Sequence, residues 1–321
     1  MGVEQIRARA HAKVNLHLGV GQARADGYHE LVTIFQSLSL HDELELKVLS
    51  KRAPKHGSVI DTLTLSGQAK GVPDDEDNLV WQAVDKLVAA YRAEGIGQLP
   101  MVELHLRKGI PVAGGMAGGS ADAAAALRVT QAWLSEHADP LPESVLESIA
   151  AELGSDVPFT LHGGTMLGTG RGENLIPVMS RGHYHWVLAV SAAGLSTPEV
   201  FHKLDQLRES GRELPAHTDT TVLSRSLLNG DVAAVAANLV NDLQAPAISL
   251  RPGLRQILAA GEEAGALRGI VSGSGPTCAF LCRDAAHAAE VAGELIDSGL
   301  VIAAHPAQGP AEGAHVVPET F

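Results

Sequence analysis

Cysteine and aromatic residues are scarce in this sequence of 321 residues. Aromatic side chains make up only 3% of it, so a hydrophobic core must be built mainly from Ala, Val, Leu and Ile. The two cysteines, Cys278 and Cys282, are too few to frame a disulfide-stapled fold, and no histidine or cysteine stands near them at zinc-ligand spacing. We expect both to be small buried side chains in one strand.

Basic residues and long apolar runs are also few. The 24 Lys and Arg against 37 Asp and Glu give a net charge of −13. Nucleic acid as the main partner requires a basic face and is therefore excluded, whereas a few local donors can still hold a small anion. Apolar runs such as residues 186–195 fall short of the roughly 18 residues that a membrane span requires, and the N-terminus has no apolar signal core. We expect a soluble, cytoplasmic protein with no membrane partner.

The remaining composition, 45% hydrophobic and 19% charged, is that of a globular protein. Residues 163–172 are dense in glycine and are expected to form a loop between two halves. Alternating and helical periodicities predict strands at 6–20, 32–49, 63–65, 101–108, 186–190, 269–272 and 277–282, and helices at 79–92, 120–134, 142–153, 198–208, 221–228, 231–239, 252–264 and 285–297.

This order of elements predicts an α+β protein with two lobes. We expect an N-terminal lobe over residues 1–165 and a C-terminal lobe over 166–305. Residues 306–321 are rich in Pro, Gly and Ala and are expected to be a flexible tail. The sequence leaves the oligomeric state open.

A glycine-rich segment joins the strand at 101–108 to the helix predicted from Ser120. Residues 111–120 read PVAGGMAGGS, so the backbone can turn tightly with its N–H groups facing inward. The unpaired amides and the positive dipole end of the following helix would complete an anion site suited to nucleotide phosphates. A flexible loop that merely permits close helix–strand packing is the alternative.

The segment matches neither of the common phosphate motifs, because it has no Gly-Lys-Ser/Thr and no Gly-x-Gly-x-x-Gly. Ser120 could cap the helix, coordinate a metal or donate to a phosphate, and the sequence does not separate these roles. Asp122, in the first turn of the predicted helix, is explained by complementing the helix dipole and is given no catalytic role.

Three further motifs make the assignment specific. They are AKVNL at 12–16 with RADGYH at 24–29, LGSDVPF at 153–159, and VSGSGPT at 271–277. In this order, and together with the glycine-rich segment, they resemble the GHMP small-molecule kinases from about residue 6 to residue 300. The resemblance implies a lobe like ribosomal protein S5 domain 2, a ferredoxin-like second lobe, and phosphorylation of an alcohol by ATP. It is nearest to the branch of the family whose acceptor carries a cytidine diphosphate group.

The resemblance also implies roles for individual residues. Asp156 would be the general base, and Lys13 would keep it ionised and steady the attacking oxygen. Without the resemblance, Asp156 would be interpreted as a turn-forming residue and Lys13 as a solvent-exposed strand residue. The ATP-binding residues would be Asn78, Leu79, Pro111, Gly114, Gly115, Met116, Ala117, Gly118, Gly119 and Ser120. Asn78 is also a plausible helix cap.

The acceptor would be bound by residues from both halves of the chain. Tyr28 and Phe201 would sandwich the cytosine base and His29 would bond its polar edge, although Phe201 alone reads as a core residue. Asn15 would bind the polar chain or diphosphate, and Gly273 with Ser274 would close against the phosphate loop and the substrate.

Two alternatives stay open at this stage. One is a family member that acts on homoserine or mevalonate, although these substrates have no base for Tyr28 and His29 to bind. The other is a non-catalytic nucleotide-binding regulator with the same fold. Magnesium is expected with ATP, but no protein ligand for it is identified. Ala113 and Ala117 stand where many relatives have Gly, which preserves the turn if their φ angles are negative.

Overall fold

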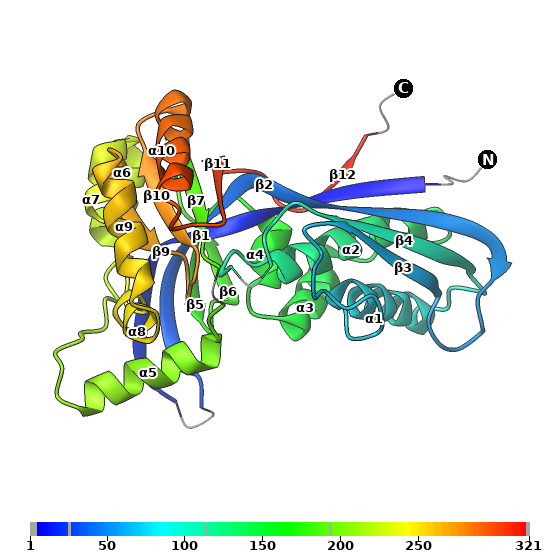
Figure 1. Cartoon of the computed structure of the whole chain (residues 1–321). Coiled ribbons are helices and arrows are strands. Elements are labelled where there is room, and N and C mark those ends of the chain that lie inside the picture. The colour runs from blue at the N-terminus through cyan, green and yellow to red at the C-terminus, as the bar shows by residue number, and fades with distance from the viewer. Residues whose placement is uncertain (1–4, 25–26, 113, 193, 319–321) are drawn as a thin grey trace.

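Two long antiparallel strands, β1 (Gln5–Ala23) and β2 (His29–Arg52), run through both lobes of the computed structural model (Figure 1). The structure describes residues 5–24, 27–112, 114–192 and 194–318. Side chains of β1 alternate between buried and partly exposed up to Ala12, and then stay buried to Val20. One face of the strand is therefore open at first, and both faces are covered where β1 passes between the lobes.

The first lobe is a mixed sheet covered on one face by helices. Its strands follow the order β12-β1-β2-β4-β3, with β5 paired to β2, β6 to β5 and β8 to β1. Helix α2 packs against β1 and β2, and its run of small buried alanines lets it approach the sheet closely. The other elements are β3 (Ile60–Gly67), α1 (Leu79–Ala93), β4 (Pro100–Lys108), α2 (Gly118–Leu134), α3 (Glu143–Leu153), α4 (Val157–His162), β5 (Thr165–Gly170), β6 (Asn174–Pro177), β8 (Val240–Asn241) and β12 (His315–Val317).

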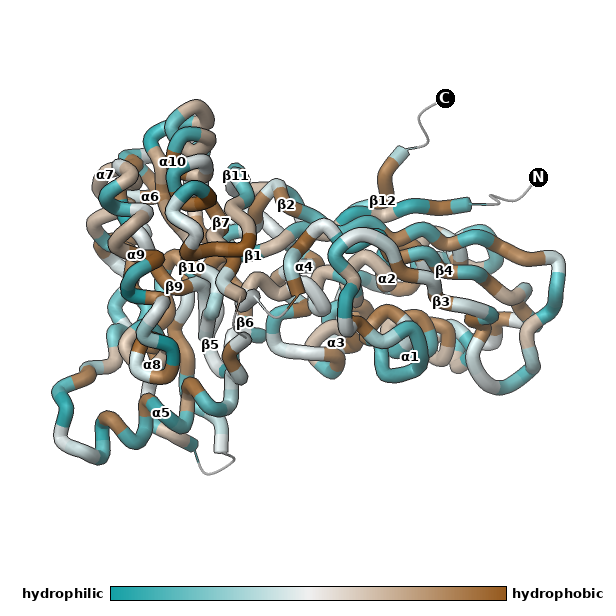
Figure 2. The backbone as a smooth tube through the Cα atoms, in the orientation of Figure 1, coloured by the Kyte–Doolittle hydropathy of each residue, from teal (hydrophilic) through white to brown (hydrophobic). Residues whose placement is uncertain are grey.

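The second lobe is a four-stranded antiparallel sheet in the order β11-β7-β10-β9, flanked by helices. The hydrophobic tube segments at β7, β9 and β10 mark its interior (Figure 2), where Val187 and Phe280 are fully buried. Its elements are β7 (Tyr184–Val190), α5 (Thr197–Glu209), α6 (Thr221–Asn229), α7 (Val232–Ala237), α8 (Gln244–Leu250), α9 (Gly253–Glu263), β9 (Arg268–Val271), β10 (Cys278–Cys282), α10 (Ala285–Asp297) and β11 (Ala303–Gly309).

Most of the elements expected from periodicity are present, and the α+β class with two lobes is confirmed. Asn78 caps α1, because its side chain accepts the amide of Val80 at 2.9 Å. Cys278 and Cys282 are free, fully buried and in one strand, as expected. Burial raises the pKa of each thiol to about 12.

Two expectations about glycine- and proline-rich segments were wrong. Residues 163–172 do not form a loop between halves: β5 pairs with β2, and Gly168 leaves room for the ring of Phe35. The expected tail at 306–321 is ordered over its described residues, in β11 and in β12, which pairs with β1. β11 is an edge strand, where Pro306 is tolerated because an edge residue need not donate to a neighbour.

The lobes are not two consecutive segments of the chain. β5 and β6 extend the first sheet to Pro177, past the expected division at 165/166, and the second sheet begins at Tyr184. β8 and β12 then return to the first sheet from the C-terminal half. The chain therefore crosses between the lobes several times.

The turn between β4 and α2 holds a strained residue. α2 begins at Gly118, two residues before the expected start, and Ala117 precedes it with φ of 59°. Ala117 is the one residue other than glycine with positive φ in the described part of the chain. We expected alanine at 113 and 117 to preserve the turn with negative φ angles, and for Ala117 this expectation was wrong. Ala113 lies outside the described residues.

We expect Ala117→Gly to stabilise the protein. Glycine removes a left-handed strain of about 1–2 kcal/mol but adds unfolded-state entropy, so the free energy of unfolding should rise by about 0.5–1 kcal/mol. Urea titration measures this change. Ala124→Gly, at a buried position inside α2, is the matched control and should lower the same free energy. Equal losses in both variants would contradict strain at Ala117.

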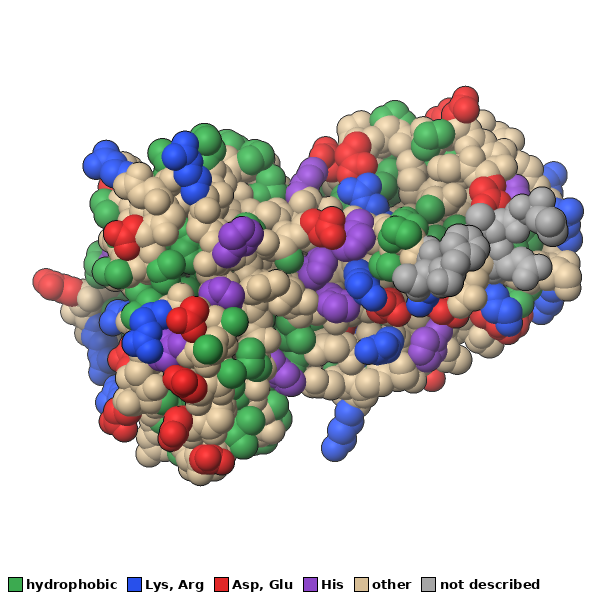
Figure 3. All heavy atoms as spheres, turned by 90° about the horizontal axis from the view of Figure 1, so that it is seen from above, with side chains coloured by type: hydrophobic (Ala, Val, Ile, Leu, Met, Phe, Trp, Pro, Cys, Tyr) green, Lys and Arg blue, Asp and Glu red, His purple; other side chains and the backbone are tan. Residues whose placement is uncertain are grey.

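Histidine side chains gather on one face of the molecule (Figure 3). Three histidines on paired strands also lie close together: the ring of His11 is 5.6 Å from that of His41 and 5.7 Å from that of His315. Burial, reinforced by His41 and His315, lowers the pKa of His11 from 6.5 to about 4. Native His11 therefore stays neutral at a pH where the unfolded chain takes up a proton.

This difference predicts a loss of stability in mild acid. As pH falls below 6.5, protonation of the unfolded state should cost about 2 kcal/mol of unfolding free energy by about pH 5. His11→Gln should remove that part of the pH dependence in urea titrations at neutral and acidic pH. An unchanged dependence in the variant would show that other groups cause the loss.

Candidate active site

The glycine-rich loop between β4 and α2 contacts both lobes. The amide of Lys13 in β1 donates to the carbonyl of Met116 at 3.2 Å. The hydroxyl of Ser272, from the loop after β9, donates to the carbonyl of Gly115 at 3.1 Å. A Cβ at Gly115 would lie 2.3 Å from the carbonyl oxygen of Ser272, so this approach requires glycine.

A cavity of about 370 Å³ opens above this loop and the start of α2. The first amides of α2 have no partner within the helix and carry the positive end of its dipole, so the cavity is suited to phosphate groups. It is lined by all the expected ATP-binding residues except Ser120: Asn78, Leu79, Pro111, Gly114, Gly115, Met116, Ala117, Gly118 and Gly119.

Ser120 lies apart from this lining. Because α2 begins at Gly118 with Ala117 in the cap position, Ser120 does not cap the helix. Its carbonyl accepts the hydroxyl of Thr160 from α4 at 3.0 Å. The remaining roles of its hydroxyl, toward a metal or a phosphate, stay predictions.

Lys13 and Asp156 meet although they are distant in the sequence. The ammonium of Lys13 is almost completely buried and lies 3.6 Å from a carboxylate oxygen of Asp156. Asp156 immediately precedes α4, but its side chain makes no capping bond, so the carboxylate faces the cavity rather than the helix. Lys13 also donates to Asn15 at 2.7 Å, and Asn15 donates to Thr33 at 2.8 Å.

These residues line a central cavity of about 290 Å³ that connects two others. It shares Gly115 and Ala117 with the cavity above the glycine-rich loop. Gly273 and Ser274 close its side from the second lobe, where Ser274 bonds Thr197 at 2.8 Å. The acid–amine pair is thus placed next to the phosphate loop.

The third cavity, of about 980 Å³, is lined by the three expected aromatic and imidazole residues, Tyr28, His29 and Phe201. The rings of His29 and Phe201 are 5.1 Å apart, and Tyr28 is 54% exposed. His29 is buried, and its Nε2 lies 2.9 Å from a carboxylate oxygen of Asp205. One ring nitrogen is therefore oriented by the protein while the ring faces the cavity.

Sequence reasoning missed Asp205 and Arg171. Asp205 stands four residues after Phe201 on α5, so helical spacing puts both on one face and could have revealed it. Arg171 lies between two glycines in the β5–β6 turn and carries no such signal. It lines both the central and the large cavity, and its guanidinium lies 5.1 Å from the ring centre of Tyr28.

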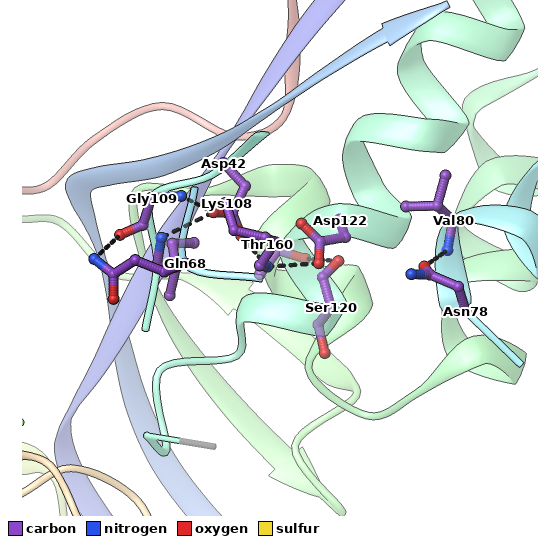
Figure 4. Close-up of polar contacts among 10 residues, drawn as sticks. Asp42, Gln68, Asn78, Val80, Lys108, Gly109, Ser120, Asp122 and Thr160 are labelled. Carbon is purple, nitrogen blue, oxygen red and sulfur yellow. Dashed lines mark hydrogen bonds and ion pairs between the residues drawn. The ribbon is translucent and has the colours of Figure 1, made fainter. Parts of the chain in front are cut away.

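A buried ion cluster beneath the glycine-rich loop was also missed (Figure 4). Lys108, at the end of β4, donates to Asp42 of β2 and to Asp122 of α2, the latter at 2.6 Å. All three side chains are less than 5% exposed. Burial, reinforced by Asp42 and opposed by Lys108, raises the pKa of Asp122 well above its usual range. Asp122 therefore does more than complement a helix dipole.

In the described residues, no group of three or more His, Cys, Asp and Glu is placed to hold a metal ion. Within the same part of the chain, none of the helices combines the length and hydropathy needed to cross a bilayer.

Comparison with known proteins supports the same assignment. Residues 78–164 match the model of the GHMP kinases N terminal domain, and residues 223–299 match that of the GHMP kinases C terminal region. A 4-diphosphocytidyl-2-C-methyl-D-erythritol kinase of Corynebacterium efficiens is 54% identical over 98% of both chains. One of Nocardia farcinica is 53% identical over 97% of this chain and 96% of its own.

Solved structures agree. A 4-(cytidine 5'-diphospho)-2C-methyl-D-erythritol kinase superposes with a TM-score of 0.73 at 29% identity, covering 94% of this chain and 98% of the other. The mevalonate kinase of L. major, solved with R-mevalonate, gives 0.72 at 14% identity over 95% and 96%, which shows the shared fold alone. The chain therefore belongs to the GHMP kinases, and within them to the family of 4-diphosphocytidyl-2-C-methyl-D-erythritol kinases.

Proposed function

We propose that this protein transfers the γ-phosphate of ATP to the 2-hydroxyl of 4-(cytidine 5'-diphospho)-2-C-methyl-D-erythritol. The products are the 2-phosphate and ADP, and the reaction belongs to non-mevalonate isoprenoid precursor biosynthesis in the cytoplasm. The observation that carries the proposal is the Lys13–Asp156 contact of 3.6 Å in a cavity that joins the phosphate loop to the large cavity.

The acid–amine pair performs the proton chemistry. Asp156 accepts the proton of the attacking hydroxyl, while the ammonium of Lys13 stabilises the developing alkoxide. Asn15 anchors Lys13 through its side-chain oxygen, and Thr33 anchors Asn15 in turn. The amine thus reaches the reacting atoms in a fixed direction.

The phosphate loop binds the donor. The amides of the loop and of the first turn of α2 hold the triphosphate, and Leu79 with Asn78 contacts the adenine. Because Asn78 caps α1, the same residue fixes the start of the helix that borders the nucleotide.

Magnesium is expected to enter with ATP. The carboxylates that line the nucleotide cavity are Asp77 and Asp122, and Asp122 is engaged by Lys108. This fits an ion held chiefly by phosphate oxygens, as Mg²⁺ commonly is. The ion supplies neutralisation of charge on the transferring group.

The large cavity favours a cytidine-bearing acceptor over a small alcohol. Tyr28 and Phe201 offer faces for a base, and His29 offers a ring nitrogen for its polar edge. Among the described residues that line this cavity, Arg171 is the single lysine or arginine, and it also lines the central cavity. A diphosphate running from the base toward Asp156 would pass it. Homoserine and mevalonate would leave these groups unused.

Substitution of either member of the acid–amine pair should greatly lower turnover without loss of ATP binding. We expect Asp156→Asn and Lys13→Met each to lower kcat by about 10²–10⁴-fold, the range of a positioned general base. Affinity for a nonhydrolysable ATP analogue should stay within about twofold. Coupled ADP release and calorimetry measure the two quantities. Near-wild-type turnover in folded Asp156→Asn protein would contradict this mechanism.

Loss of a base contact should act on the acceptor alone. Phe201→Ala and Tyr28→Ala remove a stacking face worth about 1–3 kcal/mol, so KM for the cytidyl substrate should rise about 5–150-fold. Asp205→Asn should also raise it, by freeing the His29 ring. KM for ATP is the internal control and should not move. Efficient phosphorylation of homoserine or mevalonate, with none of the cytidyl substrate, would refute the assignment.

A further inference from the structure

The nucleotide cavity has one cationic side chain to meet a polyanion. Among its lining residues in the described chain, Lys108 is the single lysine or arginine, and the acids are Asp77 and Asp122. A triphosphate brings several negative charges into this space. The charge state of the Lys108 cluster therefore decides how strongly the cavity attracts its ligand.

Lys108 lies directly under the start of α2. A Cβ built on Gly118 would come within 3.4 Å of the Lys108 ammonium nitrogen, so the cation sits behind the first amides of the helix. It lies there because β4 ends at Lys108, and Asp42 binds the next two amides of the chain, Gly109 at 2.7 Å and Ile110 at 2.8 Å. The strand end, the loop and the cation are thus held as one unit.

The two carboxylates of the cluster are not equivalent. Asp42 uses one oxygen for Lys108 and the other for two backbone amides. Asp122 uses one oxygen for Lys108, whereas its Oδ1 is buried and has no hydrogen-bond partner among the described residues. An ionised carboxylate with an unpartnered buried oxygen is costly, and a neutral carboxyl group is much less so.

We propose that Lys108 is the cation that attracts the nucleotide phosphates, and that Asp122 must carry a proton while they are bound. With Asp122 ionised, Lys108 faces two carboxylates, and the cluster carries a net negative charge beside the phosphates. With Asp122 protonated, Asp42 alone balances Lys108, and the cluster is neutral with its ammonium nearest the loop. Nucleotide binding is then coupled to the proton on Asp122. The proposal rests on the proposed function only in that ATP is the donor.

The groups facing Asp122 favour the proton. Burial and Asp42 raise its pKa, and Lys108 opposes this. Asp77 is the other acid that lines the same cavity. His41 neighbours Asp42 on β2 but packs against His11, on the other face of the strand. A bound triphosphate adds negative charge and raises the pKa of Asp122 further.

The first test separates charge from shape. Lys108→Met should weaken binding of the ATP analogue AMP-PNP about tenfold or more, while binding of uncharged adenosine should change by less than about twofold. Lys108→Arg should retain most of the AMP-PNP affinity. The surface variant Lys86→Met, whose lysine pairs with Glu152, is the matched control and should bind both ligands normally. Equal losses for AMP-PNP and adenosine would reduce Lys108 to a structural role and overturn the proposal.

Lys108→Met leaves two buried carboxyl groups without their cation, so a second variant guards against misfolding. Lys108→Met/Asp122→Asn removes the cation together with one of these two carboxyl groups and should show the same selective loss of AMP-PNP affinity. Normal affinity in this folded double variant would overturn the role of the cation.

The second test follows the proton. Asp122→Asn mimics the neutral carboxyl group in shape and charge. The ratio of AMP-PNP dissociation constants, wild type over variant, should be near one in mild acid and rise with pH as Asp122 ionises in the free enzyme. Titration of the nucleotide is common to both proteins and cancels in the ratio. A flat ratio between about pH 5.5 and 9 would refute the proton coupling. None of these measurements involves the acceptor, so a wrong acceptor would leave them unaffected.

Discussion

The backbone of the glycine-rich loop is the constraint on which the rest of the site depends. It is bonded from β1 through the amide of Lys13 and from the second lobe through Ser272. Both contacts use main-chain carbonyls of the loop, so its path is set by two sheets and not by its own side chains. The Lys13 bond has a second consequence. The residue that orders the loop with its amide is the residue that meets Asp156 with its ammonium. In the proposed mechanism, donor binding and proton transfer therefore depend on one strand position.

The chain carries a net negative charge, which repels the anionic substrates that the site must bind. With −13 overall, long-range steering of ATP or a diphosphate is unfavourable, and local groups must overcome it. The cations Lys13, Lys108 and Arg171 line successive parts of the connected cavities. Each has an acidic partner, so each is fixed in place. A fixed cation loses little rotamer entropy on binding, while its partner reduces its net charge. A proton on Asp122 would remove one of the two negative charges beside Lys108, so that more of its positive charge acts on the phosphates.

Local patterns were sufficient to predict the long elements and the linear motifs, but not the short strands β5, β6, β11 and β12. Alternation in β1 and β2, the Asn78 cap and the glycine-rich turn are properties of short segments, and the structure reproduces them. The Lys108 cluster could not be predicted in this way, because Asp42, Lys108 and Asp122 come together only when β2, β4 and α2 pack. The prediction of a tail at residues 306–321 was wrong for a related reason. Pro and Gly indicate a tail when read locally, but an edge strand tolerates them once a sheet is present to pair with. Ala117 shows the converse, since its φ of 59° is imposed by the loop and not chosen by its side chain.

In the proposed function, the path of the chain would tie recognition of the acceptor to catalysis. Helix α5 carries Phe201 and Asp205 on the wall of the large cavity, and at its start Thr197 bonds Ser274 beside the central cavity. Asn241 of β8 donates to the carbonyls of Val271 and Gly273 at 2.7 and 2.8 Å. The groups proposed to face the base and the loop proposed to face the reacting atoms are thus attached to one framework. An acceptor that does not fill the large cavity would make fewer contacts with α5. It would also forfeit the binding energy that orients its hydroxyl toward Asp156. Selectivity in this fold is therefore expected in kcat as well as in KM.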